Sequence, residues 1–362
     1  MRKSGVRLAL SWNSIKGHLS QITAIRKAIA RDRLHHALLL AGPSGLGKRM
    51  IAYRAAASLL CGNADADDFC GECACCRRIL AGTHPDVTLV EREPGKRFIV
   101  IGDDNEGKNK STAIHSIRAL SDLAFRKPFE ADRKVIIVDE CERITAEAQD
   151  AFLKTLEEPP ANTHFFLICS NPQALHETVV SRCLMLRFYP LDSVTVREVV
   201  SNVTDMTFDR HIQLSVAFSN GSPGNAVGFS RESLIEEIEW FLDWFEAFPS
   251  ADPFEASEEL LGRTEDGVSK KKGEDSRSSL EPLRERLIFF FGLAQQCLRP
   301  SAFEPLGNLL PAWVSSQPDE VRADCIEAIL ESVRDIQANV KPQFVVDYLT
   351  VRINRYVTKQ PR

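Results

Sequence analysis

The first half of the chain alternates short apolar runs with segments whose apolar residues recur at helical spacing. A short apolar run bounded by turn residues indicates a buried strand, and apolar residues three or four positions apart indicate a helix. The predicted strands are residues 37–41, 87–90, 98–101, 134–138, 165–169 and 184–188. The predicted helices are residues 17–33, 112–125, 146–157 and 175–180, with one more after Lys48. This alternation predicts an α/β fold in which helices cover both faces of a parallel sheet.

From Asp192 onward the pattern is entirely helical, and the predicted helices are residues 194–203, 211–219, 225–229, 233–248, 283–298, 302–313 and 319–356. A chain of 362 residues is too long for one ordinary core. We therefore expect an α/β domain over residues 1–190, a small helical domain over 191–232 and an all-helical domain over 233–362. Residues 262–279 are highly charged and have no apolar period, which predicts a disordered loop.

The composition is that of a globular protein outside the membrane, with 44% hydrophobic and 26% charged residues. No apolar run approaches the roughly 20 residues that span a bilayer, and the N-terminus lacks a signal-peptide core. We therefore expect a cytoplasmic protein. The net charge of −5 is the wrong sign for a protein that holds DNA by itself.

The residues between the first strand and its helix read Gly-Pro-Ser-Gly-Leu-Gly-Lys and end at Lys48. A glycine-rich turn at this place directs backbone N–H groups toward a phosphate, and the lysine reaches the outer phosphates of a nucleotide. Gly42, Gly45 and Gly47 allow the tight turn. The next residue, Arg49, stands where the motif has a Ser or Thr whose hydroxyl binds Mg²⁺. The sequence therefore predicts a phosphate-binding loop at a site with little ATPase activity.

Two acids follow the predicted strand 134–138 and complete the acidic half of such a site. Asp139 suits a contact to Mg²⁺, and Glu140 suits the base that activates water. Two outcomes stay open at this point. ATP binds at the loop without turnover, or Arg49 pairs with Asp139 and occludes the site.

Half of the ten cysteines fall within one short segment. Cys61, Cys70, Cys73 and Cys76 have the spacing C-x8-C-x2-C-x2-C, which lets four thiolates converge on one structural zinc ion. We interpret Cys75 as a bystander. The remaining cysteines are interpreted as ordinary core residues: Cys141, Cys169, Cys183, Cys297 and Cys325.

Several strings resemble bacterial DNA polymerase III clamp-loader subunits, which are AAA+ proteins. The strings are Leu34-His-His-Ala-Leu-Leu-Leu40, the cysteine cluster, Gly82-Thr-His-Pro-Asp86, Leu153-Lys-Thr-Leu-Glu-Glu-Pro-Pro160 and Ser181-Arg-Cys183. The resemblance is strong over about residues 10–190 and weak beyond. It is shared by the gamma/tau and delta-prime families. The opening Trp12-Asn-Ser-Ile-Lys-Gly-His18, Arg49, and Gly224 at the position of a sensor arginine favour the delta-prime family.

The resemblance implies a helical lid over residues 191–232 and a helical collar over 233–362. It implies that Arg182 acts as an arginine finger on the nucleotide of a neighbouring subunit. The implied partners are gamma/tau and delta subunits, a sliding clamp and, through the complex, primed DNA. Little ATPase activity is expected of the chain itself, although it would be a component of the DNA polymerase III holoenzyme.

Three alternatives remain. The first is an active gamma-like ATPase that tolerates Arg49. The second is a DNA-binding module built on the zinc site, which the acidic net charge disfavours. The third is a general AAA+ remodelling protein, which is hard to reconcile with the specific strings.

Overall fold

The computed structural model describes residues 11–64, 68–93, 96–102, 113–204, 208–229, 232–266, 280–299 and 306–358. The chain divides into two compact units. Unit 1 comprises residues up to Val203 together with Gly221–Asn225, and unit 2 comprises Thr204–Asn220 and everything from Ala226 onward. Among the described residues, no helix is long and apolar enough to cross a membrane.

Unit 1 is built on a six-stranded sheet in which all neighbouring strands pair in parallel, in the order β3-β2-β4-β5-β1-β6. The strands are β1 (Ala37–Ala41), β2 (Val87–Val90), β3 (Ala113–Ile114), β4 (Lys134–Val138), β5 (Thr163–Cys169) and β6 (Leu184–Arg187). The predicted parallel α/β sheet is therefore confirmed.

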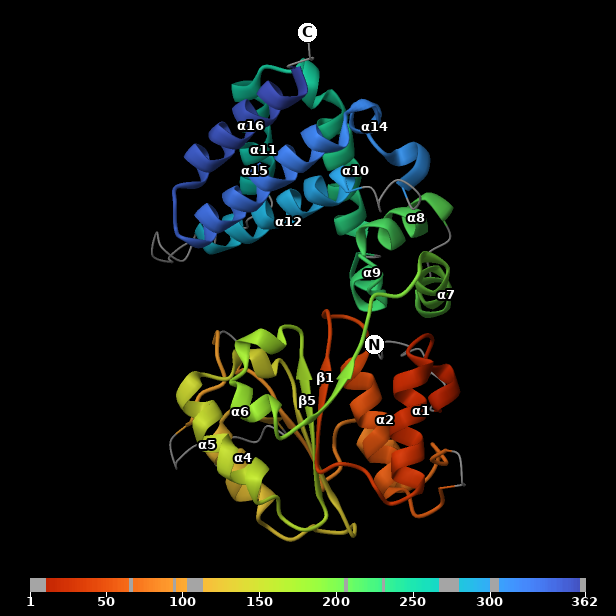
Figure 1. Cartoon of the computed structure of the whole chain (residues 1–362). Coiled ribbons are helices and arrows are strands. Elements are labelled where there is room, and N and C mark those ends of the chain that lie inside the picture. The colour runs from red at the N-terminus through yellow and green to blue at the C-terminus, as the bar shows by residue number, and fades with distance from the viewer. Residues whose placement is uncertain are drawn as a thin grey trace. The chain divides into compact units, whose positions relative to one another are not determined.

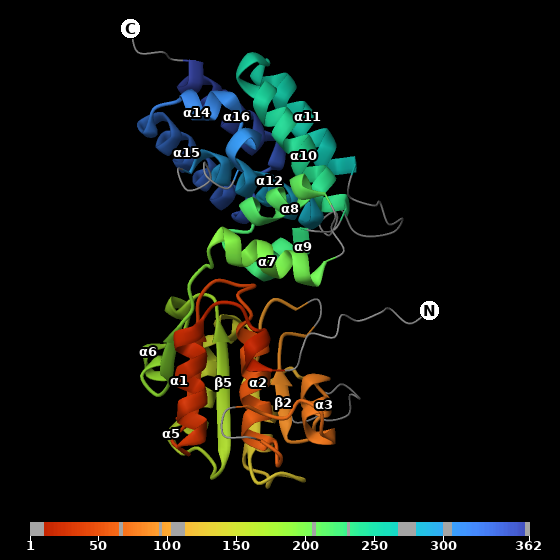
Figure 2. The ribbon, with the colours of Figure 1, turned by 90° about the vertical axis from the view of Figure 1, so that its right-hand side faces the viewer.

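Helices cover both faces of this sheet (Figures 1 and 2). One face carries α1 (Leu19–Ala30), α2 (Lys48–Leu60) and α3 (Ala74–Leu80), and the other carries α4 (Ile117–Ala124), α5 (Ala146–Glu157) and α6 (Glu177–Val180). Because strand side chains alternate, Leu38 and Leu40 of β1 enter the core beneath α1 and α2, whereas Leu39 enters the core beneath α4 and α5. Helix α7 (Ser193–Val203) follows the last strand.

Two predicted elements of unit 1 were wrong. Residues 98–101 form no strand, because Ile99 and Val100 make only isolated bridges. The helix predicted from residue 112 begins at Ile117, since residues 113–114 pair with β2 and the Ser116 hydroxyl caps the helix by accepting from Ala119 N at 3.4 Å.

Two buried charged groups fix the connection between α4 and β4. The Asp86 carboxylate accepts hydrogen bonds from the backbone N–H groups of Phe129, Glu130 and Ala131 at 2.5, 2.9 and 2.9 Å. The Lys134 ammonium donates to the carbonyl oxygen of Leu123 at 2.6 Å. Burial raises the pKa of the Asp86 carboxyl, but the three N–H groups outweigh it and hold that pKa below its ordinary value.

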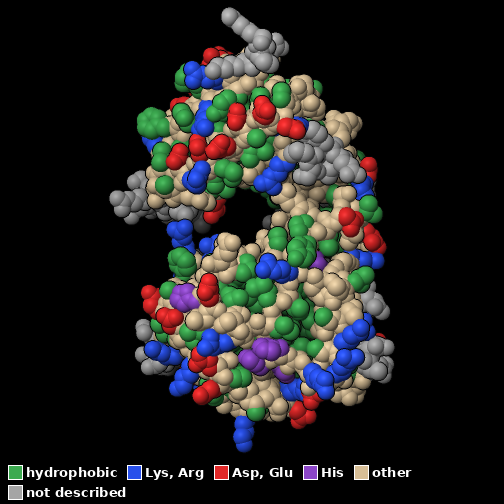
Figure 3. All heavy atoms as spheres, in the orientation of Figure 1, with side chains coloured by type: hydrophobic (Ala, Val, Ile, Leu, Met, Phe, Trp, Pro, Cys, Tyr) green, Lys and Arg blue, Asp and Glu red, His purple; other side chains and the backbone are tan. Residues whose placement is uncertain are grey.

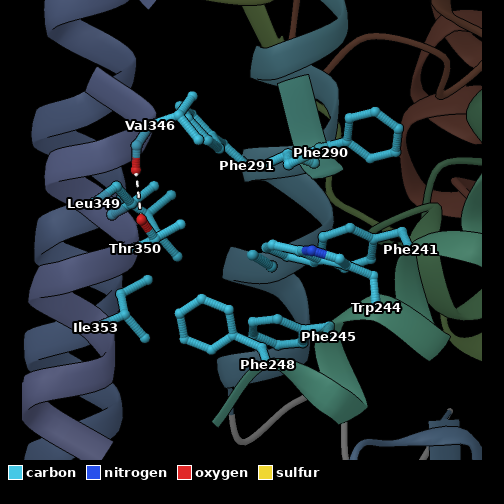
Figure 4. Close-up of a pocket in the computed structure, with 13 residues that line it drawn as sticks. Phe241, Trp244, Phe245, Phe248, Phe290, Phe291, Val346, Leu349, Thr350 and Ile353 are labelled. Carbon is cyan, nitrogen blue, oxygen red and sulfur yellow. Dashed lines mark hydrogen bonds between the residues drawn. The ribbon is translucent and has the colours of Figure 1, made fainter. Parts of the chain in front are cut away.

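Unit 2 is all helical, as predicted. Its helices are α8 (Asp209–Phe218), α10 (Glu232–Ala247), α11 (Pro253–Asp266), α12 (Leu280–Leu298), α14 (Ala312–Ser316), α15 (Asp319–Gln337) and α16 (Pro342–Thr358), and α9 (Pro223–Phe229) runs from unit 1 into unit 2. Aromatic side chains dominate its core. The ring centroids of Phe241 and Phe290 lie 5.8 Å apart, and a small apolar cavity opens between α10, α12 and α16 (Figure 4).

Three predictions in unit 2, two helices and one loop, need correction. The single helix predicted for 319–356 is two helices, because Asn339 has φ +67° and Pro342 starts α16. The helix predicted for 302–313 lies outside the described residues at 302–305; Leu306 is helical, a 3-10 turn follows at Gly307–Leu309, and α14 begins only at Ala312. The predicted loop starts too early, since 262–266 form the last turns of α11 with Thr264 buried; residues 267–279 lie outside the described residues.

The three hydrogen bonds to the Asp86 carboxylate predict that the free energy of unfolding depends on pH. We expect Asp86→Asn to lower the free energy of unfolding by about 2–3 kcal/mol at neutral pH, because three buried N–H groups lose an ionised acceptor. Since the folded pKa is depressed, this contribution is present above the unfolded pKa of about 3.9 and is lost as the pH falls through the folded pKa. Urea unfolding at several pH values measures it. Asp122→Asn on the exposed side of α4 is the control, and equal losses in both variants would contradict the assignment.

Candidate functional site

The carboxyl ends of the parallel strands bring the predicted nucleotide residues to one edge of the sheet. Gly42 follows β1, Asp139 follows β4 and Ser170 follows β5. Glu91, which the sequence analysis missed, follows β2. Ligand sites in parallel α/β sheets lie at this edge, so the position of Glu91 after a strand was the signal that could have found it.

Lys48 begins α2 and is buried, with 4% of its surface exposed. Its ammonium donates to the carbonyl oxygen of Gly42 and, at 2.5 Å, to that of Pro43. Burial lowers the pKa of the Lys48 ammonium, while the carboxylates of Glu142 and Asp139 act in the opposite direction. The lysine of the phosphate loop is thus satisfied by the loop's own backbone.

Arg49 lies between two carboxylates at the strand ends. One guanidinium nitrogen is 3.0 Å from Glu91 Oε2 and 3.1 Å from Asp139 Oδ2. Burial raises the pKa of the Asp139 carboxyl, and the Arg49 charge offsets part of this effect. Of the two outcomes that the sequence left open, the ion pair between Arg49 and Asp139 is present. A cation therefore occupies the acidic group that Mg²⁺ would use in a working site.

The two glutamates beyond Asp139 point to different partners. Glu140 adopts φ +48°, and its carboxylate oxygen accepts from Arg92 Nε at 2.7 Å. The carboxylate of Glu142, also missed from the sequence, accepts from Ser170 N at 3.1 Å and from the Ser170 hydroxyl. The residue predicted to activate water is therefore paired with an arginine.

A distant segment, Gly221–Asn225, contacts the phosphate loop within unit 1. The Ser222 hydroxyl donates to Ser44 O at 3.0 Å, and Gly224 N donates to Gly45 O at 2.8 Å. A Cβ atom on Gly224 would lie 2.8 Å from both Gly45 Cα and Gly45 O. The absence of a side chain at position 224 therefore permits this close backbone contact.

Arg182 follows α6 and is partly exposed, with 33% of its side chain accessible. Its guanidinium donates to Glu157 Oε1 at 2.5 Å and to Thr178 O at 2.8 Å. Glu157 belongs to the Leu-Lys-Thr-Leu-Glu-Glu-Pro-Pro string, so the two strings quoted above meet at this ion pair. The contacts fix the direction of the guanidinium and leave part of it open to solvent.

The four predicted zinc ligands converge. The sulfur atoms of Cys61, Cys70, Cys73 and Cys76 all lie within 4.8 Å of one another. Cys61 Sγ is 3.6 Å from Cys70 Sγ, and Cys70 Sγ is 3.9 Å from Cys76 Sγ. Four sulfurs at about 2.3 Å from a zinc ion would be about 3.8 Å apart, so the cluster fits a closed tetrahedral site.

Backbone amides donate hydrogen bonds to two of these thiols. Cys70 Sγ accepts from Cys73 N at 3.4 Å, and Cys73 Sγ caps α3 by accepting from Cys76 N at 3.4 Å. The N–H groups of Cys73 and Glu72 lower the pKa of the Cys70 thiol to about 6. Burial raises the pKa of the Cys61 thiol, so the full set of thiolates needs the compensating charge of a cation.

The neighbouring Cys75 stays outside the cluster. Its sulfur lies 3.4 Å from Nε2 of the buried His84, and the same nitrogen is 2.9 Å from Glu130 Oε1. His84 Nδ1 accepts from Asp86 N at 3.1 Å. The Gly-Thr-His-Pro-Asp string therefore joins the cysteine segment to the Asp86 network and has a structural role.

A glycine-rich turn, a lysine and strand-end carboxylates at the carboxyl edge of a parallel sheet form the arrangement that is typical of a P-loop nucleotide site. The family model described as DNA polymerase III, delta subunit, matches residues 17–192. Residues 17–192 are therefore similar to this DNA polymerase III family, and the resemblance drawn from the strings of this region is confirmed.

Individual relatives agree with this family. A DNA polymerase III subunit delta' from Pseudomonas aeruginosa is 36% identical over 57% of this chain and 61% of its own length. That from Bacillus subtilis is 29% identical over 64% of each chain. The subunit tau of Escherichia coli is 29% identical over 63% of this chain and 34% of its own. The chain thus matches less than two thirds of the length of these relatives.

A solved structure of a DNA polymerase III gamma subunit-related protein from Thermotoga maritima is also similar. It covers 93% of this chain and 99% of its own, with 19% identity and a TM-score of 0.45.

Removal of the cluster's thiolates tests the zinc site. We expect the double variant Cys70→Ser, Cys73→Ser to lose about one equivalent of zinc per chain and to unfold at lower urea concentration, because metal binding contributes folding free energy. Elemental analysis of the purified protein gives the metal content. Cys75→Ser is the matched control because it lies in the same segment but outside the cluster. Unchanged zinc in the double variant would show that the thiolates are not the ligands.

Proposed function

We propose that this chain is a clamp-loader subunit that hydrolyses little ATP itself and supplies Arg182 to the nucleotide site of a neighbouring gamma/tau-type subunit. In this role it acts as a stator during the loading of a sliding clamp on primed DNA. The observation that carries the proposal is the contrast between two arginines. Arg49 fills the chain's own acidic site, whereas Arg182 stays partly exposed at a position fixed by Glu157.

The state of the phosphate loop supports the first half of this proposal. Phosphoryl transfer needs Mg²⁺ between the phosphates and the acidic group. Position 49 offers no hydroxyl, Asp139 is neutralised by a guanidinium, and Lys48 is held by backbone carbonyls. The 221–225 segment adds two hydrogen bonds that hold the loop in this state.

The geometry around Arg182 supports the second half. A guanidinium that is already oriented loses less conformational entropy when it meets a phosphate. The Glu157 carboxylate and the Thr178 carbonyl supply that orientation, and a partner's nucleotide can replace Glu157 as the anionic partner.

Exposed apolar side chains offer surfaces for the proposed protein partners. In unit 2, Phe344, Tyr348 and Val351 lie on one side of α16 at helical spacing and are 64%, 61% and 40% exposed. This stripe suits the proposed helical collar. In unit 1, Phe125 and Phe129 are 58% and 84% exposed on the connection fixed by Asp86, which suits contact with a clamp or another subunit.

The alternatives have less support. A gamma-like ATPase would need the acidic group that Arg49 occupies. For a zinc-dependent DNA-binding module, a continuous basic surface would be expected. On the face drawn in Figure 3, basic and acidic side chains are intermixed in each unit, and Arg78 beside the cysteine cluster is paired with Glu130 at 2.5 Å.

The trans role of Arg182 is tested in a clamp loader reconstituted with gamma/tau and delta subunits. We expect Arg182→Ala to lower DNA-stimulated ATP hydrolysis severalfold, with a loss of up to about 10³-fold at the neighbouring site. Arg182→Lys should recover only part of the rate, because an ammonium lacks the planar fork. Lys48→Ala should leave the rate near that of the unmodified complex.

Arg187→Ala, which removes an exposed arginine from the end of β6, controls for a general change of surface charge. Binding of the variant to its partner subunits is measured by size exclusion so that failed assembly is recognised. A larger loss from Lys48→Ala than from Arg182→Ala would mean that the chain's own site is working.

We propose that the Arg49–Asp139 ion pair and the 221–225 segment keep nucleotide out of the phosphate loop. This closed loop is tested by measuring the binding of a fluorescent ATP analogue to the isolated chain. We expect Arg49→Thr to increase Mg²⁺-dependent binding about tenfold or more, since it restores the hydroxyl and frees Asp139. Adding Gly224→Ala should tighten binding further, because a Cβ atom 2.8 Å from Gly45 Cα forces the segment off the loop.

Gly228→Ala is the matched control for this helix, since a Cβ atom there meets nothing within 4 Å. Binding to the unmodified chain as tight as to Arg49→Thr would contradict the closed loop. This measurement needs no partner subunit, so its outcome is independent of the role of Arg182.

A further inference from the structure

Three possible metal ligands lie together beneath the carboxyl edge of the sheet, away from the four-cysteine cluster. The sulfur atoms of Cys141 and Cys169 and a carboxylate oxygen of Glu142 are all within 4.8 Å of one another. Both thiols are fully buried, and Glu142 is half-buried. The sequence analysis interpreted the two cysteines as ordinary core residues, because they are 28 positions apart along the chain.

The sheet brings these residues together. Strands β4 and β5 are neighbours, and Val138 at the end of β4 pairs with Leu167, two residues before Cys169. Beyond β4, Glu140 takes a left-handed conformation with φ +48°. The chain then turns Cys141 into the core between the two strand ends, next to Cys169.

The donor set suits a cation of the zinc class. Thiolate sulfur combined with one carboxylate oxygen favours zinc or a similar borderline-soft ion over Mg²⁺ or Ca²⁺. Ligand atoms about 2.0–2.3 Å from such an ion are about 3.5–3.8 Å apart, and the three ligand atoms here all lie within 4.8 Å of one another. The Ser170 backbone N–H and hydroxyl orient the Glu142 carboxylate, as hydrogen bonds to a metal-binding carboxylate commonly do.

The surrounding charge is also suitable. Two thiolates and one carboxylate with a divalent ion carry one net negative charge. The Lys48 ammonium interacts electrostatically with Cys141, Glu142 and Cys169, and its positive charge would balance that net negative charge. The two carboxylates that could compete for Lys48 or for the ion, Asp139 and Glu91, are already paired with Arg49.

We propose that Cys141, Glu142 and Cys169 bind a second divalent cation of the zinc class, independent of the Cys61–Cys76 cluster. Three protein ligands leave one coordination position for water or an added ligand, whereas the four-cysteine cluster is closed. Bound metal ties the chain after β4 to the end of β5 and thereby fixes the turn that carries Asp139 and Glu140.

Metal titration of the full chain tests this proposal. The protein is stripped with a chelator, kept reduced with a phosphine and titrated with Co²⁺ and then with Zn²⁺. We expect two equivalents to bind. A four-thiolate and a two-thiolate cobalt site absorb with different intensity in the thiolate charge-transfer region, so the two sites are distinguishable.

Two sets of variants show which residues bind each equivalent of metal. The double variant Cys141→Ser, Cys169→Ser should lose the weaker cobalt signal and bind one equivalent, and Cys70→Ser, Cys73→Ser should lose the stronger one. Glu142→Gln preserves the shape of the side chain and should weaken the second equivalent about tenfold or more, as loss of an ionised ligand does. Cys297→Ser, which alters a buried cysteine of α12, should retain both equivalents.

Circular dichroism of each variant shows whether it is folded. If a buried serine at position 141 or 169 prevents folding, Glu142→Gln still tests the site, because it changes no buried thiol. A single equivalent bound by the unmodified chain would overturn the proposal, and so would a second equivalent that survives both the double variant at 141 and 169 and Glu142→Gln. None of these readouts depends on partner subunits or on ATP.

Discussion

The parallel pairing of β1 with β5 and β6 is the constraint on which unit 1 depends. All five residues of β1 are buried, so water cannot satisfy its backbone groups and both neighbouring strands must do so. Parallel neighbours force the chain to return to the same end of the sheet before the next strand, and helices α2–α6 lie in such returns. The carboxyl ends of the strands therefore meet at one edge, where Gly42, Asp139 and Ser170 lie.

At that edge, electrostatics decides what the fold can do. A buried cation or anion is stable only when an opposite charge or a set of dipoles compensates it. Lys48 uses backbone carbonyls, and Asp139 and Glu91 use Arg49. In an active phosphate site a nucleotide and Mg²⁺ would supply these compensating charges. Replacing a hydroxyl by a guanidinium at one position thus provides the acidic group with a partner from within the chain.

The sequence predicted the features that depend on local spacing. The strands at β1 and β4 follow from continuous apolar runs, and the four-cysteine cluster follows from ligands within one short segment. The pairing of Arg49 with Asp139 could be proposed because both sit at known places of one motif. Helix boundaries were less accurate, since Ser116 as a cap and Asn339 in a left-handed conformation act through single residues that the apolar period does not register.

The residues that the sequence analysis missed are joined by tertiary contacts alone. Ser222 meets Ser44 from 178 positions away, and Glu91 reaches Arg49 from another strand. The same distinction separates the two thiol clusters. Cys61, Cys70, Cys73 and Cys76 converge through a local turn, whereas Cys141 and Cys169 converge only because β4 and β5 are adjacent. Since Arg49 pairs with Asp139 and Glu91, and Arg92 pairs with Glu140, Glu142 is the described carboxylate at this edge that lies beside the thiols and Lys48. Arg49 thus pairs with two acids of the predicted nucleotide site, and Glu142 stays beside the two thiols as their carboxylate neighbour.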